Sequence, residues 1–355
     1  MPEYDPMRQR QQLVEQRLKV DFDTYDVTVD ELIRRVEKGR IEIAPVYQRQ
    51  FRWDPTRQSR LIESLLLGIP VPPLFMATNW IVGQQVQWEV VDGLQRLLTL
   101  VNFAGDQAAR SAAALLEPPL QLGHMEKLTE LNGYGFSDLT EDIRTALEDR
   151  PIKIIVLNDK SDLQVRFDLF ERLNTGGIRL TDQEVRECVY RGDFMNCVAT
   201  LASSEEFKTI LRLPESKWKD GTPEEYVLRF FAFLERYLEF DHSVKDFLNE
   251  FTQKAALDPR IEGRATVFKN TFEYLAKTFP DGIKSRKGIT PVNLFEGLAV
   301  GAALALNITP SLNALARPAW VQSEVLRRYT TGPTNSKPRV RGRIEFCRDK
   351  FLGVI

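Results

Sequence analysis

The chain has 355 residues, of which 43% are hydrophobic and 28% are charged, and its formal net charge is −2. These values are those of a globular protein. No apolar run approaches the ~20 residues that cross a bilayer, and no secretory signal opens the sequence. We therefore expect a cytoplasmic protein without a membrane contact. Only two histidines are present, which excludes an HNH nuclease site in this sequence.

Residues 25–190 alternate between helical and extended patterns, after a charged, Gln-rich extension over 1–24 that resembles a frayed helix. A capping box at Thr28 and Glu31 and an Asp54-Pro55 step mark two helix starts. The strand that ends at Asp92 leads directly into a helix. The predicted helices cover 28–38, 54–68 and 94–102, and the predicted strands cover 41–43, 74–77, 86–91 and 152–157. These patterns predict a mixed α and β domain.

From residue 162 onward the pattern is almost entirely helical. A capping box at Thr181 to Glu184 and the steps Thr222-Pro223 and Thr290-Pro291 mark strong helix starts. Aromatic residues at helical spacing over 230–240 are interpreted as core. Residues 330–343, rich in Gly, Pro and cations, are predicted to form an exposed loop. We place the domain boundary between 180 and 220 and assign residues 191–355 to a helical domain.

The three cysteines, Cys188, Cys197 and Cys347, form no CxxC pair. This spacing argues against a disulfide framework or a thiolate metal site. We interpret all three as buried thiols.

Three short segments carry side chains suited to phosphate chemistry. The first spans residues 45–53 and places Tyr47, Gln48, Arg49 and Trp53 just before a predicted helix. Guanidinium groups bind phosphate through paired hydrogen bonds, aromatic rings offer flat faces to a base, and a helix N-terminus favours an anion. The alternative is a surface turn whose aromatic rings pack on the next helix and whose arginines are solvated.

The second segment, residues 89–99, runs from a strand through a glycine turn into a helix. Asp92 could hold Mg²⁺ or polarise a water, Gln95 could position that water, and Arg96 could neutralise phosphate charge. The predicted catalytic residues are therefore Asp92, Gln95 and Arg96, and the predicted nucleotide contacts are Gly93 and Thr99. The alternative makes Asp92 a simple N-cap and pairs Arg96 with an acid such as Glu89.

The third segment, residues 170–181, ends a helix in a polar Gly-Gly loop before the next helix. Consecutive backbone amides in such a loop can form an anion-binding nest, so Asn174 and Gly177 are further candidate nucleotide contacts. The alternative is a helix stop without a ligand.

Together, the three segments resemble the GmrS-like domain of GmrSD-type, modification-dependent restriction enzymes. Members carry Tyr-Gln-Arg followed by an aromatic residue and Trp, then Asp-Gly-Gln-Gln-Arg, then Phe-x-Arg-Leu-Asn-x-x-Gly. The second motif departs at one position, because Leu94 replaces the first glutamine. A helical run at 225–230 is also similar to one in many members. The resemblance covers about residues 25–240.

The resemblance implies an α+β protein with a ParB/sulfiredoxin-like N-terminal domain, a nucleotide pocket at the Asp-Gly turn, and an all-helical C-terminal domain. It implies binding and hydrolysis of nucleoside triphosphates in an anti-phage or DNA-restriction system, in which Asp92 is our candidate Mg²⁺ ligand. Many relatives carry an HNH nuclease whose histidines are absent here. We therefore expect a short form that acts with a separately encoded nuclease or effector of the HEPN or HNH type. An oligomer is compatible with this arrangement.

Two other functions stay open. From Arg317 to Ile355 the sequence has nine Lys or Arg against three acids, a local charge of +6. Arg339, Arg341 and Arg343 are therefore candidate contacts for DNA or RNA in a non-catalytic sensor or antitoxin-like partner. A Mg²⁺-dependent nuclease is the further alternative, since Asp and Glu alone can hold the metal.

Overall fold

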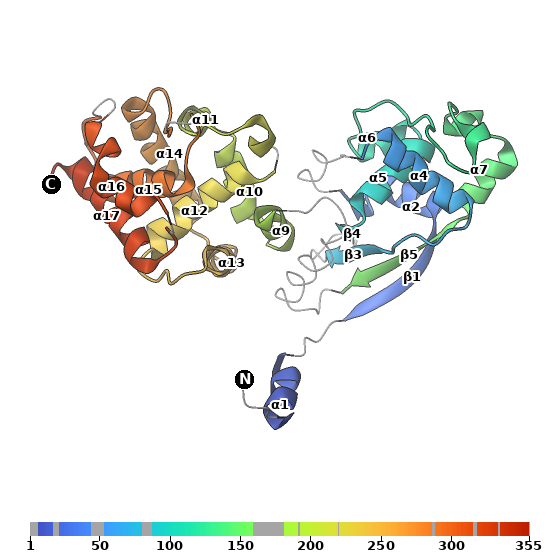
Figure 1. Cartoon of the computed structure of the whole chain (residues 1–355), viewed down its shortest axis with the longest axis horizontal. Coiled ribbons are helices and arrows are strands. Elements are labelled where there is room, and N and C mark those ends of the chain that lie inside the picture. Colours follow the sequence, from blue (N-terminus) through green and yellow to red (C-terminus); the bar gives the residue numbers. More distant parts are fainter. Residues whose placement is uncertain are drawn as a thin grey trace. The chain divides into compact units, whose positions relative to one another are not determined.

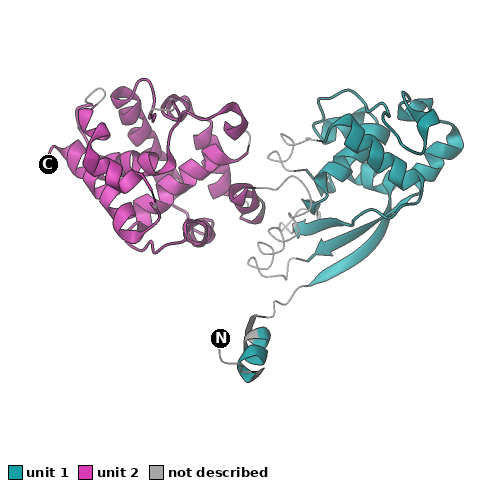
Figure 2. Cartoon of the chain, in the orientation of Figure 1, with its two compact units in different colours: residues 1–179 teal, residues 180–355 magenta. Residues whose placement is uncertain are grey.

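The chain divides into two compact units, residues 1–179 and 180–355 (Figure 2). The computed structural model describes residues 6–16, 21–43, 53–79, 87–158, 181–190, 192–218, 220–285, 288–314, 318–332 and 334–354. It shows a mixed α and β protein. Among the described helices, none combines the length and the apolar character needed to span a bilayer.

Five strands in the described part of unit 1 form one mixed sheet in the order β1-β5-β3-β4-β2. The strands are β1 (Phe22–Thr28), β2 (Ile41–Glu42), β3 (Leu74–Asn79), β4 (Gln87–Asp92) and β5 (Pro151–Leu157). β1 pairs antiparallel with β5, and β3 pairs antiparallel with β4. β3 is parallel to β5, and β2 is parallel to β4.

Helices cover one face of this sheet (Figure 1). They are α2 (Val29–Glu37), α4 (Pro55–Leu66), α5 (Leu94–Ala104), α6 (Gln107–Ala112) and α7 (Glu141–Glu148), with single 3₁₀ turns at Thr129–Leu131 and Phe136–Asp138. The chain also begins with α1 (Pro6–Gln16). The Thr28 hydroxyl accepts a hydrogen bond from Glu31 N at 3.4 Å, and Asp54 accepts from Arg57 N at 2.8 Å. These caps start α2 and α4 where the sequence predicts them.

The strand β1 was not predicted. Its sequence FDTYDVT has few apolar residues, and its first five residues are exposed. An edge strand that buries little apolar surface lacks the alternation by which strands are recognised. Its register is instead set by pairing with β5, from Phe22 opposite Leu157 to Thr28 opposite Pro151.

The described residues of unit 2 are predominantly helical. The helices are α9 (Asp182–Val189), α10 (Asp193–Ala202), α11 (Glu205–Ile210), α12 (Thr222–Arg236), α13 (Val244–Ala255), α14 (Ile261–Thr278), α15 (Val292–Ile308), α16 (Glu324–Thr330) and α17 (Lys337–Leu352), with 3₁₀ turns at Glu215–Trp218 and Ala319–Gln322. Aromatic rings fill the core: Phe207 packs edge-on against Phe272, with ring centroids 5.2 Å apart, and Phe230 meets Phe268 at 5.4 Å. The interpretation of the aromatic run over 230–240 as core is confirmed for Phe230, Phe231, Phe233 and Phe240, which are buried, but not for Tyr237, which is partly exposed.

The prediction of an exposed loop over 330–343 is wrong for its second half, because α17 begins at Lys337. Pro338 lies in the first turn, where a missing N–H costs nothing. Gly342 is not a loop signal: a Cβ there would lie 2.4 Å from Cε1 of Tyr329. The glycine lets α17 pack closely on the end of α16.

The compact units divide between residues 179 and 180, at the start of the predicted range of 180–220, and α9 belongs to unit 2, where it packs against α12 and α13. Arg186 of α9 lies 3.6 Å from the Glu225 carboxylate of α12. Of the thiols whose side chains are described, Cys347 is buried as predicted, whereas Cys197 is only half-buried. Burial raises the pKa of Cys347 far above its ordinary value.

Candidate functional site

The turn between β4 and α5 depends on a glycine. Asp92 ends β4, Gly93 adopts a left-handed conformation with φ 94°, and α5 begins at Leu94. A Cβ on Gly93 would lie 2.3 Å from Cδ2 of Leu74 and 2.9 Å from Nη2 of Arg96. Both the backbone conformation and the close approach of Arg96 therefore require glycine at this position.

Asp92 and Arg96 form an ion pair across the first turn of α5. Nη2 of Arg96 donates to Oδ2 of Asp92 at 2.7 Å, and Nη1 donates to the carbonyl of Pro72 at 2.8 Å. Burial lowers the pKa of Arg96, and the Asp92 carboxylate opposes this shift. The side chain of Arg96 is 12% exposed and that of Asp92 is 36% exposed. The pair thus leaves a carboxylate partly open to solvent and a guanidinium fixed behind it.

The N-cap interpretation of Asp92 is wrong. Gly93 occupies the N-cap of α5, and no side chain caps this helix. Arg96 forms its ion pair with Asp92, four positions before it, because both side chains lie on the same face of the turn.

Trp53, from the first segment, lies beside Gln95, from the second. The backbone N–H of Trp53 donates to Oε1 of Gln95 at 3.1 Å, across 42 positions of sequence. The β4–α5 turn therefore holds the predicted site residues Asp92, Gly93, Gln95 and Arg96, and Gln95 connects it to Trp53. Five others, Tyr47, Gln48, Arg49, Asn174 and Gly177, lie outside the described residues.

Thr99 has a structural contact in place of the predicted ligand contact. Its side chain is fully buried, and Oγ1 donates to the carbonyl of Gln95 at 2.7 Å. The hydroxyl is satisfied within its own helix. Thr99 therefore supports the first turns of α5 in this conformation and does not face solvent.

Three buried polar residues near this turn were missed at the sequence level. Gln58 is 4% exposed, Asn102 is 2% exposed and Arg110 is 6% exposed. Gln58 donates to the backbone carbonyl of Trp53 at 2.8 Å, and this hydrogen bond connects the three residues to the site. The available signal was Asn102, a polar residue at a position of the apolar stripe of α5.

Asp92 is the described residue that could hold a cation at this turn. Within the described ranges, no three His, Cys, Asp or Glu side chains are grouped as metal ligands. A site built on one carboxylate fits Mg²⁺, because this ion keeps several waters and takes further ligands from substrate phosphates. It does not fit a zinc site, which needs three or four protein ligands.

The basic C-terminal segment differs from the prediction at Arg343. This side chain is fully buried, pairs with Glu296, and donates to the carbonyl of Thr334 at 2.8 Å. Arg341 is 58% exposed and pairs with Glu345 at 2.9 Å. Arg339 donates to the carbonyl of Thr331 at 2.6 Å. The candidate nucleic-acid contact at Arg343 is therefore wrong for this structure, since a buried guanidinium cannot meet a phosphate backbone.

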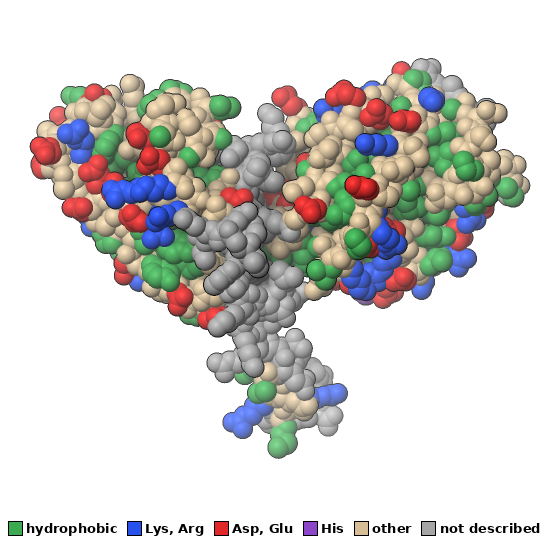
Figure 3. Space-filling view, turned by 180° about the vertical axis from the view of Figure 1, so that it is seen from behind, with side chains coloured by type: hydrophobic (Ala, Val, Ile, Leu, Met, Phe, Trp, Pro, Cys, Tyr) green, Lys and Arg blue, Asp and Glu red, His purple; other side chains and the backbone are tan. Residues whose placement is uncertain are grey.

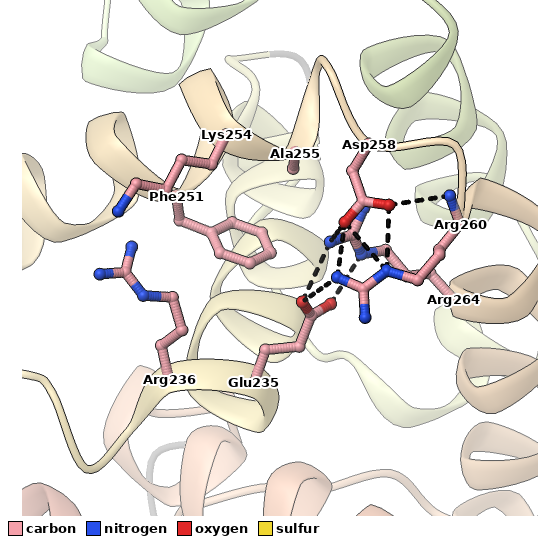
Figure 4. A pocket seen from close by; sticks show the side chains of 8 residues that line it. All are labelled: Glu235, Arg236, Phe251, Lys254, Ala255, Asp258, Arg260 and Arg264. Atoms are coloured by element: carbon pink, nitrogen blue, oxygen red, sulfur yellow. Dashed lines mark hydrogen bonds and ion pairs between the residues drawn. The ribbon is translucent and has the colours of Figure 1, made fainter.

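Unit 2 contains a cavity of about 400 Å³ among α12, α13 and α14 (Figure 4). Arg264, 8% exposed, grips both oxygens of Glu235 at 2.6 and 3.0 Å and approaches Asp258 at 3.1 Å. Hydrogen bonds from Arg260 hold the pKa of Asp258 well below its ordinary value. Lys254 and Arg236 share Glu250 on the other side. Each cation has an acidic partner, so the cluster is a structural clamp among three helices.

The Asp-Gly-x-Gln-Arg turn places a paired carboxylate and guanidinium at a strand-to-helix junction of unit 1. Residues 29–191 match the family model of the GmrSD restriction endonuclease, N-terminal domain. The matched residues are fewer than half of the chain and extend through α9 of unit 2. Comparisons with curated proteins and with solved structures found no match. The GmrSD similarity supports a component of a restriction system.

Proposed function

We propose that this protein binds and hydrolyses nucleoside triphosphates at the β4–α5 turn and acts as a sensing or regulatory component of a bacterial anti-phage or restriction system. The observation that best supports this proposal is the cluster of Asp92, Gln95 and Arg96 at the N-terminus of α5, beside Trp53. The first N–H groups of a helix have no partner within it, and they favour an anion. The GmrSD similarity of this region is consistent with the proposed role.

Each residue contributes a different property to the proposed site. The partly exposed carboxylate of Asp92 would bind Mg²⁺, and bound Mg²⁺ would supply positive charge against a polyphosphate. Arg96 holds Asp92 in place and adds a buried positive charge near the helix end. Trp53 is half-buried and connects to the cluster through its backbone N–H, which donates to Gln95. We further propose that Arg49 of the same segment contacts phosphate.

Phosphate release from ATP, GTP, CTP and UTP with Mg²⁺ tests this proposal. Turnover by the unmodified chain should be lost in Asp92→Ala and Arg96→Ala. Asp26→Ala and Arg34→Ala are matched controls, because both residues form exposed ion pairs away from the turn, with Lys153 and Asp30. Absence of turnover with all four nucleotides, with and without DNA, would remove hydrolysis from the proposal. Equal loss in the control variants would show a general effect on folding.

We also propose a partner. We propose that the chain acts with a separately encoded nuclease of the HEPN or HNH type, which would supply cleavage in such a system. Co-expression followed by a pull-down should recover a stable complex, and its absence at physiological salt would contradict this part. We also propose that unit 1 has a ParB/sulfiredoxin-like fold.

A non-catalytic nucleic-acid sensor is the second candidate. The observation that favours it is a set of exposed cations on α16 and α17, namely Arg327, Arg328, Lys337 and Arg341. The formal net charge is −2, so a field from the whole protein is not expected to attract DNA. On the face drawn in Figure 3, cations and acids are interspersed. Binding that falls steeply with salt and is lost in Arg327→Ala/Arg328→Ala would favour this function.

A further inference from the structure

We propose that the outer edge of β1 binds an extended, cationic segment of a partner protein, which adds a strand to the sheet of unit 1. In this mode of recognition, main-chain hydrogen bonds give the affinity and side chains give the specificity. The inference goes beyond the proposed function, because neither the edge nor its binding depends on a nucleotide.

The strand β1 lies at one end of the described sheet. The strand order places β5 on one side of it and no described strand on the other, and Figure 1 draws it as the outermost arrow. β1 is seven residues long, and its first five residues are exposed. The strand at the opposite end, β2, has two residues. Of these two edges, β1 is therefore the one long enough to pair with a further strand.

The hydrogen bonds at the two ends of β1 show which of its backbone groups face β5. Val29 N donates to the carbonyl of Arg150 at 3.1 Å, and Asn158 N donates to the carbonyl of Asp21 at 3.0 Å. Both bonds join residues that are directly opposite when the β1–β5 register is extended by one position. Hydrogen-bonded pairs alternate with non-bonded pairs in an antiparallel ladder. The odd-numbered residues of β1 therefore bond to β5.

The even-numbered residues point their N–H and C=O groups away from β5. They are Phe22, Thr24 and Asp26, followed by Thr28, which is the N-cap of α2. No strand of the described part pairs with this side of β1. Donors and acceptors that repeat at every second residue are what an added strand needs, and an edge of this kind is a template for pairing.

Carboxylates on both faces of the edge select the occupant. The side chains of Asp23 and Asp26 lie on opposite faces, because side chains alternate along a strand. Asp23 accepts from the neutral amide of Asn158 at 3.1 Å, so this contact leaves its charge in place. Asp26 lies 3.3 Å from Lys153, but the two side chains are 64% and 54% exposed, and such a pair is weak. Lysine or arginine on an added strand would form favourable cross-strand pairs with either acid.

The same charges disfavour a second copy of this chain as the occupant. Pairing of β1 with β1 would bring Asp23 and Asp26 of one chain close to the same acids of the other. Like charges on an edge oppose the pairing of identical strands. A basic segment of a different protein is therefore the occupant that fits this edge.

Amide exchange of the unmodified full chain tests the outward register without a partner. We expect the Thr24 amide to exchange with solvent at least about tenfold faster than the Tyr25 amide, as followed by NMR, because only the latter bonds to β5. Thr24→Pro should keep the Tm of the unmodified chain, since proline is tolerated where an edge N–H faces solvent. Equal exchange at the two amides would overturn the assignment of the free edge.

A peptide of about ten residues that alternates lysine and threonine is the probe for binding to the full chain, and a glutamate and threonine peptide is its matched control. We expect the lysine peptide to slow exchange at Phe22, Thr24 and Asp26, with a Kd at least about tenfold below that of the control. Its Kd should rise about tenfold in Thr24→Pro. The preference for lysine should be lost in Asp23→Asn/Asp26→Asn. Equal affinity for both peptides, or binding without protection of β1, would overturn the proposal.

Sedimentation of the full chain tests the second copy. A monomer at all concentrations, in the unmodified chain and in Thr24→Pro, would support a different protein as the partner. A dimer that forms with rising concentration and is lost in Thr24→Pro would assign the edge to a second copy and overturn the cationic partner.

Discussion

The substitution Arg343→Met probes the polar interior of unit 2. Arg343 of α17 is fully buried and pairs with Glu296 of α15, which is 1% exposed. Glu296 also pairs with Arg229 of α12 at 2.8 Å, and Arg229 pairs with Glu225 at 2.7 Å. Burial disfavours the charge on Arg229, but the two carboxylates raise its pKa. Removal of Arg343 leaves a buried carboxylate with one partner where it had two.

The size of the effect follows from this residual pairing. Removal of one partner of a buried ion pair usually costs ~3–5 kcal/mol. Because Arg229 still faces Glu296, we expect the lower end, about 3 kcal/mol. For a unit of this size, each kcal/mol lowers Tm by ~2–4 °C, so the Tm of unit 2 should fall by about 6–12 °C.

Scanning calorimetry of the full chain measures this change, with Arg341→Met as the control on the same helix. Arg341 is 58% exposed in its pair with Glu345, so its replacement should cost less than ~1 kcal/mol. Arg343→Met/Glu296→Met should recover most of the loss, since no buried charge is left without its partner. Equal Tm values for Arg343→Met and Arg341→Met would refute the buried pair and restore Arg343 as a candidate nucleic-acid contact.

Three further predictions address separate features. Burial and neighbouring carboxylates raise the pKa of Glu187 from 4.5 to about 8. Between these pH values the folded chain holds a proton that the unfolded chain releases, so stability should fall as pH rises through this window. Glu187→Gln should remove this slope when Tm is measured from pH 5 to 9. Gly93→Ala should destabilise unit 1 by about 2 kcal/mol in urea, and by more than Gly133→Ala, which shares the positive φ but meets no neighbour within 4 Å. Arg264→Met should lower Tm more than Arg260→Met, because their side chains are 8% and 72% exposed. The three accounts would be contradicted, in turn, by the same pH slope of Tm in Glu187→Gln and the unmodified chain, by equal destabilisation in Gly93→Ala and Gly133→Ala, and by equal Tm values for the two arginine variants.

Local chemistry explains which parts of the fold the sequence predicts well. Thr181 caps α9 through two reciprocal hydrogen bonds with Glu184, three positions later in the sequence. Glu184 N donates to Oγ1 of Thr181 at 3.2 Å, and Thr181 N donates to Oε2 of Glu184 at 2.6 Å. Such caps depend on residues within one turn, so the pattern suffices. β1 depends instead on pairing with β5, more than a hundred residues away. Its exposed polar residues give no local signal for this pairing.

The same difference separates the predicted from the missed site residues. Asp92, Gln95 and Arg96 lie within five consecutive positions, so their proximity at one turn follows from the strand-to-helix pattern. Gln58 looks like any surface glutamine of a helix until Asn102, 44 positions later, is placed against it. Arg343 looked solvated for the same reason, because its partner Glu296 lies 47 positions away in an otherwise apolar helix. That single buried acid was the available signal.

The charge balance at the β4–α5 turn bears on how the proposed site would bind its ligand. Arg96 has already committed donors to Asp92 and Pro72 and is 12% exposed, so it adds little direct contact for a phosphate. Asp92 is the more exposed member of the pair, and its negative charge is therefore nearer to an incoming polyphosphate, which it repels. A divalent cation removes this repulsion, while Arg96 keeps the carboxylate in place. In the proposed site, nucleotide and Mg²⁺ therefore strengthen each other's binding, and by thermodynamic linkage the two effects are equal.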